Sequence, residues 1–165
     1  MEINPELLDL ALTHRSFAYE SGGLPTNERL EFLGDSVLGL VITEELYARF
    51  PELDESRLSP LRSGIVNMRA LAAIGRDLDL GAALKIGKGE EVTGGRDKNS
   101  ILSDALEALV GAIYLDKGYS KTREVILTLM NKSIDEAMVR GAGLDRKSTR
   151  LNSSHSSVSR MPSSA

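Results

Sequence analysis

The sequence contains no cysteine and no tryptophan, and only 4% of its residues are aromatic. Without cysteine there can be no disulfide scaffold and no thiolate metal site, and a chain of this kind suits a reducing compartment. With so few aromatic residues, a core must be filled by Leu, Ile, Val and Ala. This composition favours packed helices over sheets, so we expect an all-α fold.

Long hydrophobic runs are also missing. The longest apolar stretches, such as Leu109–Leu115, are far shorter than the roughly 20 residues of a membrane span. The N-terminus has no basic segment followed by an apolar one, as a secretory signal would. We therefore expect a cytoplasmic protein without a membrane partner, and 165 residues suggest one folded domain.

Positive charge is in short supply as well, because the formal net charge is −4. A nucleic-acid-binding protein usually has an excess of Lys and Arg, so the charge alone argues against such a partner. A nuclease whose acidic residues are concentrated at a metal site is the alternative. The positions of the acids decide between the two.

The C-terminal segment 145–165 differs from the rest of the chain. It is dominated by Ser and has no helical period, so we expect it to be disordered. Its first residues, DRKSTRLNSSH, resemble a translated sequencing adapter, which indicates a non-native addition to a truncated reading frame. We take residues 1–144 as the domain.

Helix signals divide these residues into five segments. Asn4 and Pro5 predict a helix start, and Thr26 or Asn27 can cap a long helix that Pro51 ends near Phe50. The other predicted helices cover 56–76, 97–117 and 120–139; Gly118 ends the fourth, and Gly141 and Gly143 end the fifth. Residues 81–96, rich in glycine, are predicted to be loop. No segment alternates like a strand.

Three acids in the segment NERLEFLGDS share one helix face. Glu28, Glu31 and Asp35 are spaced by three and four residues, which places them within roughly 60° of one another. Leu30, Leu33, Val37, Leu40 and Val41 fall on the opposite side. Three like charges in one row destabilise a helix, so a purely structural face would more often include Lys or Arg.

A second acidic pair lies in the segment SILSDALEALVGAIYLD. Asp104 and Glu107 share a face with Ala108 and Gly111, and small residues there allow another helix or a substrate to approach. Leu102, Leu106, Leu109 and Ile113 form a predicted buried stripe. The two acids therefore lie at the edge of the core.

Together the two helices can form a cage of four carboxylates. Such oxygen ligands suit Mg²⁺, and two hard divalent ions about 3.5–4 Å apart can promote hydrolysis of a phosphodiester. Any one of these acids, taken alone, is more simply a solvated side chain. A di-iron helical bundle needs Glu-x-x-His on two helices. His14 is the only histidine before residue 145 and lies in neither segment, which disfavours iron.

The motif NERLEFLGDSVL resembles the signature of the ribonuclease III family, and THRSFA and DALEALVGAIYLD recur there with similar spacing. The resemblance covers about residues 5–140. It implies the all-helical endonuclease fold, a homodimer, and Mg²⁺-dependent cleavage of double-stranded RNA, including rRNA precursors, with Mn²⁺ as a substitute and no small-molecule cofactor. The expected products have 5′-phosphate and 3′-hydroxyl ends.

The resemblance also implies roles for individual residues. Metal-binding acids of the family match Glu31, Asp35, Asp104 and Glu107; Glu107 would be the most critical, and it and Asp35 would be catalytic. Glu28 matches a further acid of the catalytic site, and Glu55 does so in a less similar neighbourhood.

Contacts to RNA and to a second subunit are less sharply indicated. Lys85, Arg96 and Lys98 precede the second acidic helix and are candidates for phosphate contacts, or else ordinary solvated cations. The family places Phe32 in the dimer contact, whereas a simple reading makes it a core residue. We expect His14 and Arg15 to make structural hydrogen bonds and give His14 no catalytic role.

Alternatives to a complete nuclease stay open. In the family, a chain of this kind continues into a double-stranded-RNA-binding domain, so this polypeptide is expected to bind RNA weakly. A non-catalytic RNA-binding module of the same fold would be expected to lose acids, yet all six are present. A compact maturation nuclease of the same superfamily, and a metal-storage or redox helical bundle, fit the motifs less well.

Overall fold

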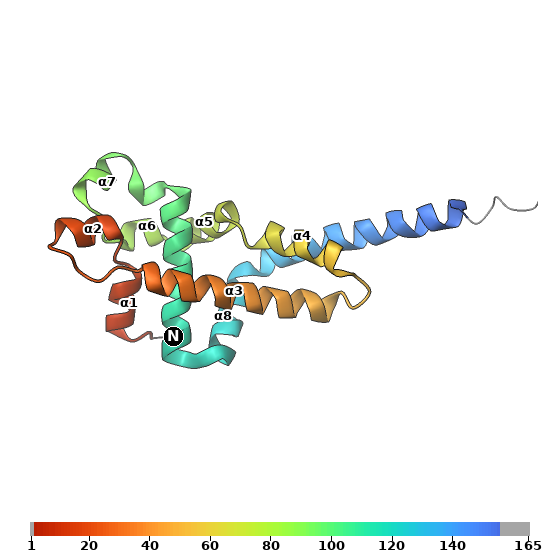
Figure 1. The fold of residues 1–165 in the computed structure, drawn as a ribbon, viewed down its shortest axis with the longest axis horizontal. Helices are drawn as coiled ribbons and strands as arrows, with labels where there is room; N and C mark the ends of the chain where they lie inside the picture. The colour runs from red at the N-terminus through yellow and green to blue at the C-terminus, as the bar shows by residue number, and fades with distance from the viewer. Residues whose placement is uncertain (1, 156–165) are drawn as a thin grey trace, which may run out of the picture.

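The computed structural model describes the backbone of residues 2–155 and the side chains of residues 2–139. It is all-helical, as predicted, and in the described chain the one β-type pairing is an isolated bridge between Thr13 and Lys85. None of the described helices is long and apolar enough to cross a membrane. The elements, shown in Figure 1, are α1 (Pro5–Ala11), α2 (Arg15–Glu20), α3 (Glu28–Arg49), α4 (Glu55–Ile65), α5 (Met68–Asp77), α6 (Leu80–Ala83), α7 (Lys88–Val92), the 3₁₀ turn η1 (Gly95–Asp97) and α8 (Asn99–His155).

The centre of the fold is the crossing of α3 with the first part of α8, visible in the middle of Figure 1. Both helices present buried apolar residues there, among them Leu38 and Val41 from α3 and Leu102 and Leu106 from α8. The sequence predicted a stripe of this kind on each helix. Leu40, assigned to the buried side of α3, is instead half exposed.

Glycine allows the two helices to approach closely. A Cβ added to Gly34 would lie 1.7 Å from the carbonyl oxygen of Glu107, and one added to Gly111 would lie 2.3 Å from that of Leu30. Any side chain at either position would meet backbone that cannot move aside. The prediction that small residues on this face allow close approach is confirmed.

The kink in α8 lies at the predicted break. Gly118 has φ 77° and ψ 178°, a conformation that side-chain-bearing residues rarely adopt. Beyond it, α8 turns back and packs along the far end of α3, where Glu45 is buried and bridges Arg49 at 2.5 Å and Arg123 at 2.7 Å. This double ion pair ties the second part of α8 to α3.

The predicted helix over 56–76 is wrong as one element, because the structure divides it between α4 and α5. The Asn67 side chain accepts a hydrogen bond from the amide of Ala70 and donates to the carbonyls of Ser63 and Gly64. It therefore caps α5 and satisfies the end of α4 at once.

Residues 81–96 are not simply loop, since they contain part of α6, all of α7 and the start of η1. These short helices depend on distant groups. Arg96 donates to the carbonyls of Gly81 and Leu84 at 2.8 Å, and the Glu20 carboxylate accepts from the amides of Lys88 and Gly89. The glycine content of this segment could not reveal such partners.

The predicted end of the last helix and the predicted disorder of the C-terminal segment are wrong for the residues up to 155. Gly141 and Gly143 do not end the last helix, because α8 continues through residues 145–155, where we expected disorder. Adding residues to an existing helix avoids the unfavourable nucleation step, so a weak sequence can continue it. Residues 156–165 lie outside the described part, and the domain boundary at residue 144 stays a prediction.

The close crossing generates a first testable prediction. Gly34→Ala should lower the free energy of unfolding by at least about 1–3 kcal/mol, because the new methyl group overlaps the backbone of α8. Gly75→Ala is the matched control: its Cβ would lie 3.2 Å from the Leu102 carbonyl oxygen, so Leu102 has to shift by only a few tenths of an ångström and the loss of stability should be smaller. Urea unfolding followed by circular dichroism measures both. Equal stability of the two variants would contradict the close approach.

Candidate metal centre

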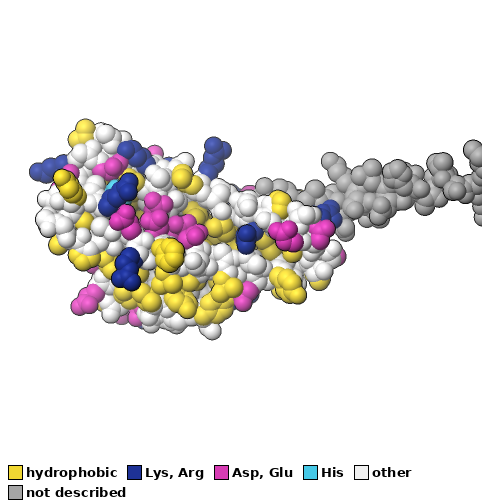
Figure 2. Space-filling model, viewed as in Figure 1, with side chains coloured by type: hydrophobic (Ala, Val, Ile, Leu, Met, Phe, Trp, Pro, Cys, Tyr) yellow, Lys and Arg dark blue, Asp and Glu magenta, His cyan; other side chains and the backbone are white. Residues whose placement is uncertain are grey.

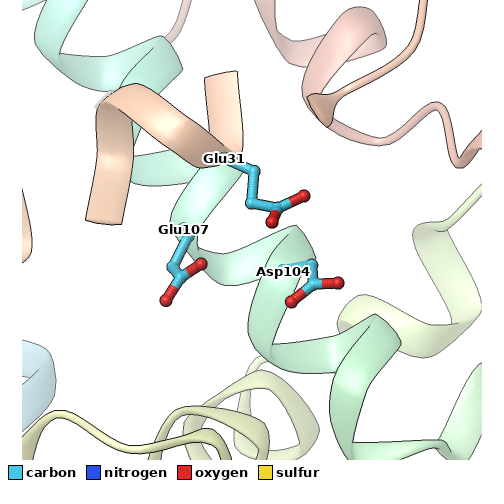
Figure 3. Close-up of side chains that lie close together, drawn as sticks. All are labelled: Glu31, Asp104 and Glu107. Atoms are coloured by element: carbon cyan, nitrogen blue, oxygen red, sulfur yellow. The ribbon is translucent and has the colours of Figure 1, made fainter. Parts of the chain in front are cut away.

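Three carboxylates from the two crossing helices meet beside the glycine contact. Glu31 of α3 and Asp104 and Glu107 of α8 each offer a ligand oxygen, and these oxygens lie within 4.8 Å of one another. Figure 3 shows the three side chains around a common space, with Asp104 and Glu107 on successive turns of one helix. All three residues are half-buried. The sequence prediction that acids of both helices converge holds for this group, which we call the acidic cluster.

Electrostatics within the acidic cluster disfavours its charged form. Burial, followed by the charges of Asp35, Asp104 and Glu31, raises the pKa of Glu107 to about 7. Burial likewise raises the pKa of Glu31 and of Asp104 above their usual values. A divalent cation would relieve both the repulsion and the lost hydration. An all-oxygen donor set of this kind fits Mg²⁺ or Mn²⁺.

Asp35, predicted as a fourth ligand, lies outside the acidic cluster. It is exposed, and it lines a separate hollow with Arg62 and Ser63. It is nonetheless near enough for its charge to raise the pKa of Glu107 and of Glu31. Its assignment as a ligand stays a prediction.

The two supporting acids lie in different places. Glu28 is exposed and lines the same cavity as Glu31 and Asp104, and its carboxylate accepts a hydrogen bond from Thr26 at 2.9 Å. Glu55 instead begins α4 and lines an apolar hollow between α3 and α4. Within one copy of the described chain, the structure thus places Glu28 beside the acidic cluster and gives Glu55 a different surrounding.

The cavity next to the acidic cluster has a volume of about 360 Å³, and both acidic and basic side chains line it. Its walls are polar or charged almost throughout: His14, Arg15, Asn27, Glu28, Glu31, Glu90, Lys98, Ser100, Ile101 and Asp104. Figure 2 shows acidic side chains gathered on this face of the molecule, with basic side chains around them. No pattern in the sequence indicated that His14 lines this cavity, because it lies in a separate segment from both acidic motifs.

The three predicted RNA-binding cations are all occupied by internal contacts. Lys98 pairs with Glu90 at 2.5 Å, Arg96 pairs with Glu91 at 2.8 Å, and Lys85 pairs with Asp9. Lys98 alone of the three lines the cavity. Their role toward phosphates stays a prediction, while their structural role in holding α6, α7 and η1 is direct.

Phe32 is not a core residue. It is 78% exposed on α3, which contradicts the interpretation of Phe32 as a core residue. The predicted dimer contact stays a prediction. Leu40 and Tyr47, further along the same helix, are also exposed. Figure 2 shows hydrophobic side chains on the same face as the acidic patch.

The raised pKa of Glu107 predicts a pH dependence of stability without metal. Below about pH 4.5 this carboxyl is protonated in both the folded and the unfolded chain. Between pH 4.5 and about 7 the unfolded chain loses the proton while the folded chain keeps it, so stability falls as pH rises. Glu107→Gln should reduce this decline, leaving only the share from Glu31 and Asp104, and be more stable than the wild type at pH 8.

Urea unfolding in chelator at several pH values between 4 and 8 measures the effect. The exposed Glu52→Gln serves as the matched control, and the wild-type decline should persist in it. A Glu107→Gln curve parallel to that of the wild type would show that burial and repulsion at Glu107 are weaker than the geometry implies.

Comparison with known proteins agrees with this geometry. A family model described as Ribonuclease-III-like matches residues 4–134. Ribonuclease 3 of Thermobifida fusca is 58% identical over 149 residues, and that of Mycolicibacterium smegmatis is 61% identical over 147 residues. These alignments cover 90% and 87% of this chain but 62% and 64% of the two relatives. The chain therefore spans less than two thirds of their length.

Solved structures show the same relationship. A structure of the nuclease domain of ribonuclease III from Campylobacter jejuni, concerned with a region involved in dimer formation, is 44% identical with a TM-score of 0.76. The match covers 81% of this chain and 90% of that one. Both the sequence and the helical arrangement lead to one assignment: the chain belongs to the ribonuclease-III-like family.

Proposed function

We propose that this chain is the nuclease domain of a metal-dependent endoribonuclease that hydrolyses double-stranded RNA. The observation that carries the proposal is the meeting of Glu31, Asp104 and Glu107 from two helices in one half-buried group. Relatives named Ribonuclease 3 support the reaction class. The proposed products are 5′-phosphate and 3′-hydroxyl ends, and rRNA precursors are among the proposed substrates. We propose the cytoplasm as the compartment, because such precursors are transcribed there.

Each acid has a proposed task. Glu31, Asp104 and Glu107 would hold Mg²⁺, or Mn²⁺ in its place, and Asp35, whose charge acts on Glu107, is the proposed fourth ligand. The bound cation would supply Lewis acidity at the scissile phosphate. Glu28, at the wall of the same cavity, supports the site from the substrate side.

The net negative charge of the chain is compatible with an RNA substrate if divalent cations occupy the acidic cluster. Three half-buried carboxylates would repel a phosphate by themselves, but divalent cations reverse the local sign. The longer relatives have further chain beyond the matched region, and we propose that this part corresponds to an RNA-binding domain that supplies most of the electrostatic affinity.

We also propose a homodimer formed along α3. The exposed side of this helix carries Phe32, Gly39, Leu40 and Tyr47, and Phe32 precedes Leu40 by eight residues while Tyr47 follows it by seven. A two-fold axis near Leu40 would run the two copies of α3 antiparallel and place Phe32 of one copy at Tyr47 of the other. A self-complementary apolar row is what a two-fold interface requires.

This dimer would give Glu55 its proposed catalytic role. Glu55 lies beyond the end of α3, in the hollow that Tyr47 also lines. In an antiparallel pair, the end of one α3 lies beside the start of the other. Glu55 of one copy would then approach the acidic cluster of its partner, although it is apart from the cluster in its own chain.

A catalytically weak RNA-binding module of the same fold is the alternative function. Such a module would have no need to keep half-buried like charges together, because they destabilise the fold without a cation. The raised pKa of Glu107, to about 7, is therefore a feature that favours the enzyme over the module.

Cleavage is tested with long double-stranded RNA, with Mg²⁺ or with chelator, at low ionic strength. We expect fragmentation with Mg²⁺ and none with chelator. Glu107→Gln should lower the rate by roughly 100-fold or more, since even the groups that orient metal ligands contribute about 10–100-fold. The surface variant Glu52→Gln should cleave like the wild type. Cleavage in chelator, or full activity of Glu107→Gln, would refute the proposed metal centre.

The dimer is tested by sedimentation analysis of Phe32→Glu. A charge in the centre of an apolar contact should raise the dissociation constant at least about tenfold, because buried aromatic anchors contribute more than about 1–2 kcal/mol. Val92→Glu is the control, since Val92 is 88% exposed on α7, away from α3. A monomeric wild type, or a Phe32→Glu variant that dimerises as tightly as the wild type, would rule out this interface.

A further inference from the structure

The cavity beside the acidic cluster has a wall that the metal chemistry does not use. His14 and Arg15 line it opposite a row of carboxylates, at the turn where α2 begins. Both residues interact with Glu28: the Arg15 guanidinium lies 3.9 Å from its carboxylate, and the negative charge of Glu28 acts to raise the pKa of His14.

The hydrogen bonds of His14 determine which ring nitrogen carries the proton. Nδ1 accepts from the Ser16 amide at 3.2 Å and lies 2.7 Å from the Ser16 hydroxyl oxygen. That oxygen accepts from the Gly87 amide at 2.8 Å, so the hydroxyl is free to donate its own proton to Nδ1. With Nδ1 accepting, the proton of the neutral ring sits on Nε2.

Nε2–H is therefore a fixed donor on a ring that lines the cavity. Burial lowers the pKa of His14, against the opposing effect of the Glu90, Asp104 and Glu28 carboxylates, so the neutral ring is favoured. Among the described residues, no hydrogen bond from Nε2 is formed. A half-buried N–H donor of fixed direction, beside the acidic cluster, is available to donate to an oxygen of a ligand in the cavity.

Arg15 differs from the other cations of this region. Its side chain is 73% exposed, and the one ion pair that it forms with the described residues, to Glu28, is long at 3.9 Å. Lys98, the other cation of the cavity wall, is instead tied to Glu90 at 2.5 Å. A guanidinium with free N–H groups is well matched to phosphate oxygens, which it can bind in a bidentate manner.

We propose that His14 and Arg15 form a phosphate-binding element for the RNA strand that is cut. The His14 Nε2–H donates to a non-bridging oxygen of a backbone phosphate in the cavity, and the Arg15 guanidinium binds the same strand at the cavity mouth. The inference rests on the proposed nuclease function and deepens it. It assigns strand positioning to this pair rather than to Lys85, Arg96 and Lys98, whose charges are engaged within the fold.

The competing interpretation is that His14 serves only to cap α2, and two substitutions separate the roles. Asn is a good N-cap residue, so His14→Asn keeps an acceptor for the Ser16 amide and removes the donor in the cavity. His14→Gln places an amide N–H near the former Nε2 but is a poorer cap. The proposal predicts opposite effects of the two variants on binding and on stability.

Binding is measured by fluorescence anisotropy with a labelled double-stranded RNA of about two helical turns, in Ca²⁺ at low salt, with RNA integrity checked afterwards on a denaturing gel. His14→Asn should bind roughly tenfold more weakly with an unchanged melting temperature, because a hydrogen bond to a charged group is lost. His14→Gln should recover most of the affinity while melting at a lower temperature.

Arg15 is tested by the salt dependence of the same binding. Arg15→Gln should weaken binding several-fold and lower the slope of log affinity against log salt by about one, as expected for one lost phosphate contact. Arg69→Gln is the matched control, because Arg69 is exposed on α5 and does not line the cavity. Its slope should equal that of the wild type.

The outcomes distinguish this inference from the proposed function. If the wild type cleaves RNA with Mg²⁺ while His14→Asn and Arg15→Gln bind and cleave as it does, the phosphate-binding element is overturned and the nuclease stands. If the less stable His14→Gln binds RNA more weakly than His14→Asn, so that affinity and melting temperature fall together, His14 only caps α2 and the proposal fails. If the wild type neither binds nor cleaves double-stranded RNA, both fall together.

Discussion

The close crossing of α3 and α8 is the constraint on which the rest of the structure depends. At Gly34 and Gly111 the two backbones lie so close that a Cβ on either glycine would overlap a backbone carbonyl of the other helix. This distance decides where Glu31 and Glu107 project, because each lies a few residues from a contact glycine on its own helix. Wider spacing would bury the same leucines but separate the carboxylates.

The crossing places like charges where they are unfavourable. In a half-buried setting, lost hydration raises the pKa of Glu31, Asp104 and Glu107, and repulsion from neighbouring carboxylates raises it further at Glu31 and Glu107. Folding energy from the apolar core must offset this cost whenever no cation is present. Functional sites often contain charged groups whose placement lowers the stability of the fold. Packing of the core elsewhere keeps such groups together.

Around the cluster, the surface is organised by ion pairs that the sequence pattern does not reveal. Lys85, Arg96 and Lys98 pair with acids within the fold, whereas Arg15, far away in sequence, is largely exposed at the cavity. Sequence position before α8 therefore did not indicate which cations are engaged within the fold. Likewise, Glu55, which the resemblance matched to an acid of the family's site, lies apart from the acidic cluster of its own chain.

The sequence by itself determined the all-helical class, the cap at Asn4, the break at Gly118, and the shared faces of the two acidic motifs, because all of these depend on local backbone geometry and helical period. The start of α3 was also predicted, but the Asn27 side chain makes no capping hydrogen bond there and instead donates to the Ala11 carbonyl. Only the tertiary structure decided that α4 and α5 separate at Asn67, that Glu31, Asp104 and Glu107 lie within 4.8 Å of one another while Asp35 lies outside, and that His14 lines their cavity. These features arise from contacts between segments distant in the chain, and helical periodicity carries no information about which distant segment a side chain will meet.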